Sequence, residues 1–243
     1  MGFSNQNTRL AAGSLLALVL GSYLFSNQAQ AASAGKDINQ VNGRIEIEAD
    51  QQVRNISSVN GSIHLACSAR AGQVQTVNGS IQLADHVVIR QARTVNGKIS
   101  VEPQSVVGGS LTTTNGSIDL REGVTVKGEL KTVNGAIQSG PGSILSELVK
   151  TGNGNIRLRN TRVGRNVETS SGDILLTEGT VVRGDVVIHR RSSLEKLFSL
   201  GRNTQPLISI DGSSRVKGEI HLYREVNLDI HPDAQVGRIV HHY

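Results

Sequence analysis

The chain has 243 residues, of which only 2% are aromatic, and no aromatic ring lies between Ser26 and Leu197. This gap excludes the ring platforms on which single-stranded nucleic acids stack and a core built on large aromatic side chains. The net charge of +5 is concentrated in residues 150–202, which is too local an excess to define a DNA-binding domain. A single cysteine, Cys67, excludes an intramolecular disulfide and a cysteine-based zinc or redox motif.

The N-terminus has the parts of a secretory signal peptide. An uncharged apolar run, residues 11–25, follows a single arginine and precedes Ala29-Gln30-Ala31. This run is shorter than the roughly 20 residues that a membrane-spanning helix needs. We predict a signal peptide over 1–31 that is cleaved before Ala32, and a linker over 32–37. The mature protein is then secreted or periplasmic, and the alternative is an uncleaved signal that anchors it to the inner membrane.

A repeat organises the remaining sequence. Eight glycines are spaced by 18 or 19 residues, each is followed two residues later by isoleucine, and asparagine precedes seven of them. The isoleucines are Ile45, Ile63, Ile81, Ile99, Ile118, Ile137, Ile156 and Ile174. Apolar and polar residues alternate within each unit, and this period of two indicates β-strands.

Units of this length cannot bury an apolar side alone, but stacking them at about 4.8 Å creates a continuous core. We therefore predict an all-β fold, a single-stranded parallel β-solenoid (β-helix) of about ten coils of 18–19 residues. A six-residue aliphatic period is not maintained, so right-handed winding is favoured. The isoleucines should form one buried stack, the glycines should supply positive φ angles at a corner, and the asparagines should hydrogen-bond from coil to coil.

The pattern changes towards the C-terminus. Regular coils are predicted over 38–189, and Val-x-Gly-x-aliphatic units persist after the Asn-Gly half of the repeat has ended. Residues 190–206 contain a Ser-x-x-Glu capping sequence and apolar residues at helical spacing. We predict a short helical insertion over 190–206, followed by irregular coils and a cap over 207–243.

Two units illustrate a family resemblance. Thr76-Val77-Asn78-Gly79-Ser80-Ile81 and Thr132-Val133-Asn134-Gly135-Ala136-Ile137 resemble the repeats of a bacterial adhesin-like β-solenoid family of unknown function. The Val-x-Gly-x-Val units also resemble those of the bactofilin-type polymer-forming proteins. The resemblance covers about residues 38–243 and implies a fold, but it supplies no active site. Bactofilins are typically cytoplasmic, so the predicted signal peptide favours the adhesin-like branch.

The outward positions between the core aliphatic residues carry no recurring carboxylate pair or metal-ligand set. We therefore expect no catalytic residues, no metal site and no cofactor, and we interpret the chain as a non-enzymatic structural or adhesin-like cell-envelope protein. One alternative is a carbohydrate-active enzyme on a solenoid scaffold, which would need clustered acids. The other is a bactofilin-like scaffold that self-assembles through its coil ends.

The first candidate surface is a polar ladder. A serine or threonine lies three residues before seven of the glycines, and it faces outward with the asparagine if the residue between them faces inward. The members of the ladder are Thr76, Thr94, Thr113, Thr132, Thr151, Asn78, Asn96, Asn115, Asn134 and Asn153. The alternative is that these side chains satisfy one another and the backbone of the corner.

The second candidate surface is basic. Its members are Arg157, Arg159, Arg162, Arg165, Arg183, Arg190 and Arg191. The functional interpretation is contact with an anionic envelope polymer, a glycan or lipid headgroups, and the alternative is a solvated face. Self-association is the other partner considered, and no specific nucleic acid is expected.

Overall fold

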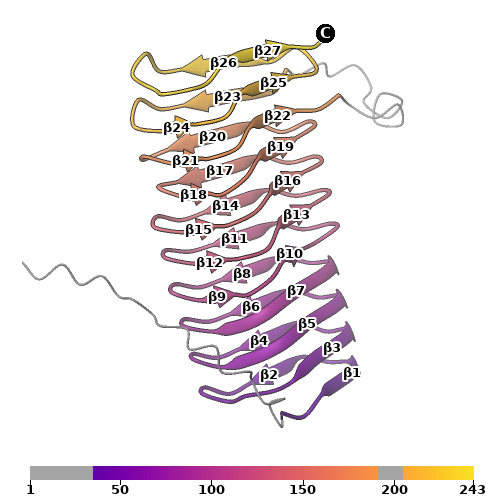
Figure 1. Ribbon diagram of the computed structural model, residues 1–243. Coiled ribbons are helices and arrows are strands. Elements are labelled where there is room, and N and C mark those ends of the chain that lie inside the picture. Colours follow the sequence, from indigo (N-terminus) through magenta and orange to yellow (C-terminus); the bar gives the residue numbers. More distant parts are fainter. Residues whose placement is uncertain (1–34, 191–204) are drawn as a thin grey trace, which may run out of the picture. The chain divides into compact units, whose positions relative to one another are not determined.

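The computed structural model describes residues 35–190 and 205–243. The predicted signal peptide and the predicted helix lie outside the described residues. Within the described residues every strand pairing is parallel and no helix is present, so none could cross a membrane. The chain is a parallel β-solenoid of ten coils, as predicted (Figure 1).

Each coil contributes one strand to a ten-stranded sheet, here called sheet B. We number the coils one to ten by these strands. They are β2 (Ile45–Ile47), β4 (Ile63–Leu65), β6 (Ile81–Leu83), β8 (Ile99–Val101), β11 (Ile118–Leu120), β14 (Ile137–Ser139), β17 (Ile156–Arg159), β20 (Ile174–Thr177), β23 (Leu207–Ile210) and β26 (Asn227–Ile230).

The opposite side of the coils forms a 17-stranded sheet, sheet A. Near the N-terminus it consists of single strands, which are β1 (Ile38–Asn42), β3 (Asn55–Asn60), β5 (Arg70–Asn78) and β7 (Val88–Asn96). From coil four onward most coils supply two short strands. The first of each pair is β9 (Val106–Val107), β12 (Thr125–Val126), β15 (Ile144–Leu145), β18 (Arg162–Val163), β21 (Val181–Val182) or β24 (Arg215–Val216). The second is β10 (Leu111–Thr112), β13 (Leu130–Thr132), β16 (Val149–Thr151), β19 (Val167–Thr169), β22 (Val186–Ile188) or β25 (Ile220–Leu222), and coil ten ends in β27 (Ile239–His241).

The core is a set of aliphatic columns between the two sheets. All eight predicted isoleucines are buried and pair in register from coil to coil, which confirms the predicted stack. The column continues through Ile208 to Leu228, although the chain offset there is larger than in the regular repeat. Slim aliphatic side chains suit this interior because each position repeats directly above its equivalent.

The glycines of the Asn-Gly corner are required for a different reason from the one predicted. Only Gly43 has a positive φ there. A Cβ at Gly79, Gly97, Gly116 or Gly135 would instead overlap the carbonyl group of the glycine one coil earlier. The close approach of successive backbones, rather than left-handed geometry, therefore selects glycine at this corner.

Left-handed residues lie at the opposite turn, between sheet B and sheet A. One residue per coil has a φ between 43° and 74° over eight coils, and six of these eight are not glycine. They are Asp50, Ser68, His86, Gln104, Gly123, Gly142, Asn160 and Glu178.

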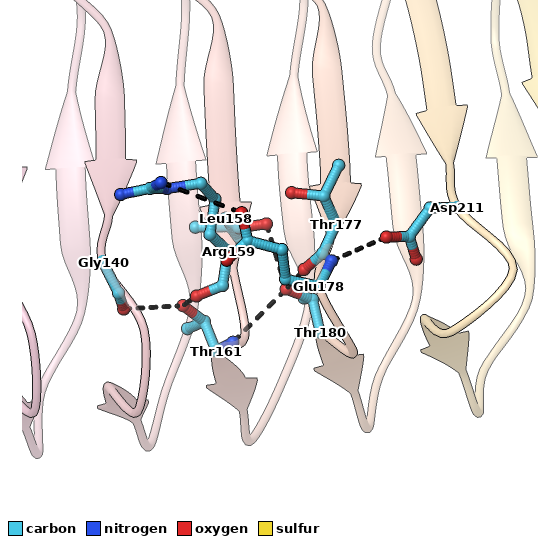
Figure 2. A network of polar contacts seen from close by, with 8 residues as sticks. All are labelled: Gly140, Leu158, Arg159, Thr161, Thr177, Glu178, Thr180 and Asp211. Atoms are coloured by element: carbon cyan, nitrogen blue, oxygen red, sulfur yellow. Dashed lines mark hydrogen bonds and ion pairs between the residues drawn. The ribbon is translucent and has the colours of Figure 1, made fainter.

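Buried hydroxyl groups stabilise this turn (Figure 2). The Thr161 N–H donates to the Thr180 hydroxyl at 3.3 Å, and that hydroxyl lies 3.0 Å from the Leu158 carbonyl. The Glu178 N–H donates to a carboxylate oxygen of Asp211 at 2.6 Å. Burial raises the pKa of Asp211, but hydrogen bonds from Ser214 and the Glu178 backbone outweigh burial and hold this pKa below its usual value. This network satisfies the buried polar groups of the turn, so we regard it as structural.

Candidate functional site

The threonines of the predicted outward ladder face inward. Thr76, Thr94, Thr113, Thr132 and Thr151 are buried, and each hydroxyl donates to a glycine carbonyl of the preceding corner at 2.9–3.0 Å. Each threonine lies two residues after a core aliphatic residue, so strand alternation turns it into the core. The outward placement of the threonines was wrong, and the corner backbone is their partner.

The asparagines are exposed and form a ladder. Each Nδ2 donates to Oδ1 of the asparagine one coil earlier at 2.9–3.1 Å, from Asn60 through to Asn153. This confirms the predicted coil-to-coil bonding. Each amide still has a second N–H and further acceptor capacity for a ligand.

The outward position between these threonines and asparagines holds valine in the first coils, but Thr114 lies between Thr113 and Asn115, and Gly152 lies between Thr151 and Asn153. We call Val41, Val59, Val77 and Val133 the valine stripe, and their exposed fractions are 64%, 42%, 41% and 44%. The predicted outward ladder required an inward residue at this position. The valine lies three residues after the core aliphatic residue of its strand, as Val77 does after Val74. Because side chains alternate along a strand, this odd spacing places the valine outside.

The basic residues do not share one surface. Arg157 is exposed on sheet B, whereas Arg162 belongs to sheet A and Arg183 directly follows β21 of that sheet. Arg159 lies 3.7 Å from a carboxylate oxygen of Glu178, and Arg165 lies 2.9 Å from one of Glu147. Arg190 donates to the His242 carbonyl at 3.1 Å, and Arg191 lies outside the described residues.

A cluster of rings lies on sheet A in coils eight to ten. We call His189, His221, Tyr223 and His242 the ring cluster. The ring centroids of Tyr223 and His242 are 4.2 Å apart and nearly parallel, and those of His189 and Tyr223 are 6.3 Å apart. Nδ1 of His221 lies 3.2 Å from Nε2 of His242. His189, Tyr223 and His242 lie in the same column as the valine stripe of the earlier coils, whereas His221 lies in the column of Val187.

Charged side chains hold the ring cluster in place. Glu168 is largely buried, and one of its carboxylate oxygens lies 2.8 Å from both Lys150 Nζ and His189 Nε2. Burial raises the pKa of Glu168, but the hydrogen bonds from Lys150 and His189 outweigh it and lower the pKa below its usual range. Glu219 is paired in turn with Arg238 at 2.9 Å and lies 3.5 Å from Nε2 of His221.

An open pocket of about 510 Å³ lies beside these rings. Its walls are Val187, His189, Arg190, His221 and Tyr223, from coils eight and nine. No family model, curated protein or solved structure matches this chain. Geometry alone therefore identifies the site.

Sequence reasoning missed this pocket because the histidines looked scattered. Their spacing becomes regular once the late coils are aligned by their glycines, since His189 and Tyr223 lie five residues after the glycines of two Val-x-Gly units and His242 lies five residues after Gly237. The described residues contain no group of three or more side chains placed to hold a metal ion.

Proposed function

We propose that this chain is a non-enzymatic, adhesin-like structural protein of the cell envelope, exported by residues 1–31, that binds its partner through an outward face of the solenoid. The observation that carries the proposal is the valine stripe beside the asparagine ladder. Val41, Val59 and Val77 lie in successive coils, and neighbouring exposed apolar side chains mark interaction surfaces on soluble proteins. The adjacent amides add hydrogen-bonding groups once per coil, so the face suits an extended partner with repeating chemistry.

Retention on purified cell envelopes tests this proposal. The double variant Val59→Asp/Val77→Asp places two charges on the stripe, and Gln82→Asp/Gln138→Asp adds the same charge at exposed positions of sheet B. We expect the stripe variant to lose at least about tenfold in retention while the control stays within twofold of wild type. Equal retention of all three proteins would contradict the proposal. Mass spectrometry of the exported protein tests cleavage before Ala32.

A specific observation favours self-assembly as a second candidate function. Leu228 occupies the buried isoleucine column, yet it is 40% exposed because β26 is the last strand of sheet B. The edge of β27 likewise pairs only with β25 among the described strands. Unpaired strand edges with apolar neighbours promote association between chains. Sedimentation should show concentration-dependent oligomers that Leu228→Lys abolishes, and a monomer at all concentrations would remove this candidate.

A further inference from the structure

We propose that the pocket between coils eight and nine binds an acidic sugar, with Arg190 holding the carboxylate of a hexuronate unit. The inference rests on the proposed binding function, but it assigns the ligand to a surface distinct from the valine stripe. A volume of about 510 Å³ falls within the range of about 300–1,000 Å³ that small-ligand sites occupy.

The charge of the pocket fits one carboxylate. Arg190 is exposed and spends one N–H on the His242 carbonyl, so its guanidinium retains donors for a ligand. A planar guanidinium matches a carboxylate in a two-point contact. The nearby acids Glu168 and Glu219 are each paired with a cation, so neither opposes an incoming anion with an unpaired charge. One permanent positive charge balances a carboxylate better than a phosphate dianion.

The remaining walls fit the rest of a sugar. Because Nε2 of His189 lies 2.8 Å from the Glu168 carboxylate, which can only accept, Nε2 donates its N–H there and Nδ1 is left to contact a sugar hydroxyl. The Tyr223 hydroxyl both donates and accepts. Sugar hydroxyls need partners of both kinds, while the Val187 side chain and the ring carbons can contact C–H groups.

The pocket is formed before a ligand arrives. Glu168 fixes His189, stacking on His242 fixes Tyr223, and the bond to the His242 carbonyl anchors Arg190. Side chains held by neighbours outside the pocket lose little conformational freedom on binding, and this lowers the cost of association. Coil ten therefore acts as a support for a site built from coils eight and nine.

Calorimetric titration of the purified full-length protein tests the proposal. The probes are a galacturonic-acid trimer, the neutral galactose trimer and inorganic phosphate. We expect binding of the acidic trimer, at least tenfold weaker binding of the neutral trimer, and no competition by phosphate at equal concentration.

Two variants locate the binding. Arg190→Gln should weaken affinity for the acidic trimer at least tenfold, whereas Arg162→Gln removes an exposed charge of the same sheet and should change it less than twofold. Equal losses from both variants would show general charge attraction and overturn the pocket. Absence of binding to the acidic trimer would also overturn the sugar-binding proposal. The proposed function would still be tested separately, by the retention of the valine-stripe variant on cell envelopes.

Discussion

Coils one to seven and coils eight to nine fill the same inward position of sheet A with different chemistry. The earlier coils place a serine or threonine there, as in Thr132, whose hydroxyl reaches the Gly116 carbonyl at 2.9 Å. The later coils place Ile188 and Leu222 there, and both are fully buried. This change coincides with the loss of the Asn-Gly corner. An inward hydroxyl is therefore found where the glycine carbonyl of that corner is available to accept its hydrogen bond.

The outward position beside it changes as well. It holds Val59 and Val77 in the regular coils and His189 and Tyr223 in the later ones. The offset between paired coils grows from 18 or 19 residues to 34 at this point, yet Ile174 and Ile208 remain in register. The comparison teaches that the inward aliphatic columns set the register, while corners can be lengthened and outward positions can acquire new functions.

The largest effect should come from charging the central column. Ile99→Asp buries an unpaired carboxylate, and we expect a loss of about 4 kcal/mol or more in unfolding free energy. Leu228→Asp changes the same column at its exposed end and should cost less than about 1 kcal/mol. Urea denaturation measures both. Similar losses of unfolding free energy would mean that the column is shielded from water in the last coil as well as in the centre.

A Cβ at the regular corner should have the next largest effect. Gly97→Ala forces a methyl group against the Gly79 carbonyl, and we expect about 2–4 kcal/mol of destabilisation. Gly108→Ala is the matched control because a Cβ there meets nothing closer than 3.7 Å. Thermal unfolding should separate the two variants clearly. A harmless Gly97→Ala would show that the coils can move apart at the corner.

Threonine should be more stabilising than valine at the inward position of the regular coils and less stabilising than valine at the same position of the later coils. Thr132→Val removes the hydroxyl that satisfies the Gly116 carbonyl and should cost about 1 kcal/mol. In coil eight, Ile188→Thr should be less stable than Ile188→Val by about 1 kcal/mol or more, because the new hydroxyl is buried without that corner. If threonine stabilises both positions, the corner carbonyl is not the deciding partner.

The smallest effect concerns pH at the border of the two regions. The folded-state pKa of Glu168 is lowered, so its contribution to stability is present above the unfolded value and is lost as pH falls through the folded value. The stability difference between wild type and Glu168→Gln should therefore shrink as pH decreases from 6 to 3. The exposed Glu129→Gln variant serves as the control. If the stability difference did not depend on pH, the charge of Glu168 would not be its cause.

The repeat predicted the fold because one feature, the spacing of Ile45 to Ile174, determines both the strands and their stacking. It also predicted the asparagine ladder. The threonine orientation was wrong because two readings of strand parity were open, and the burial of Thr94 decides between them. The ring cluster was missed because the offset between coils eight and nine is 34 residues, so His189 and Tyr223 come together only when the Val-x-Gly units of the two coils are aligned.

The corner also governs how the chain ages chemically. Asparagine followed by glycine is the dipeptide most prone to deamidation, since the glycine nitrogen can attack the side-chain amide carbon. Here the Gly97 nitrogen donates to the Asn115 carbonyl at 3.2 Å, and the Asn96 amide is held between the amides of Asn78 and Asn115. Both reacting groups are thereby immobilised in the stacked coils. At these positions the folded solenoid should deamidate more slowly than the unfolded chain. The asparagines at the two ends of the ladder should deamidate first.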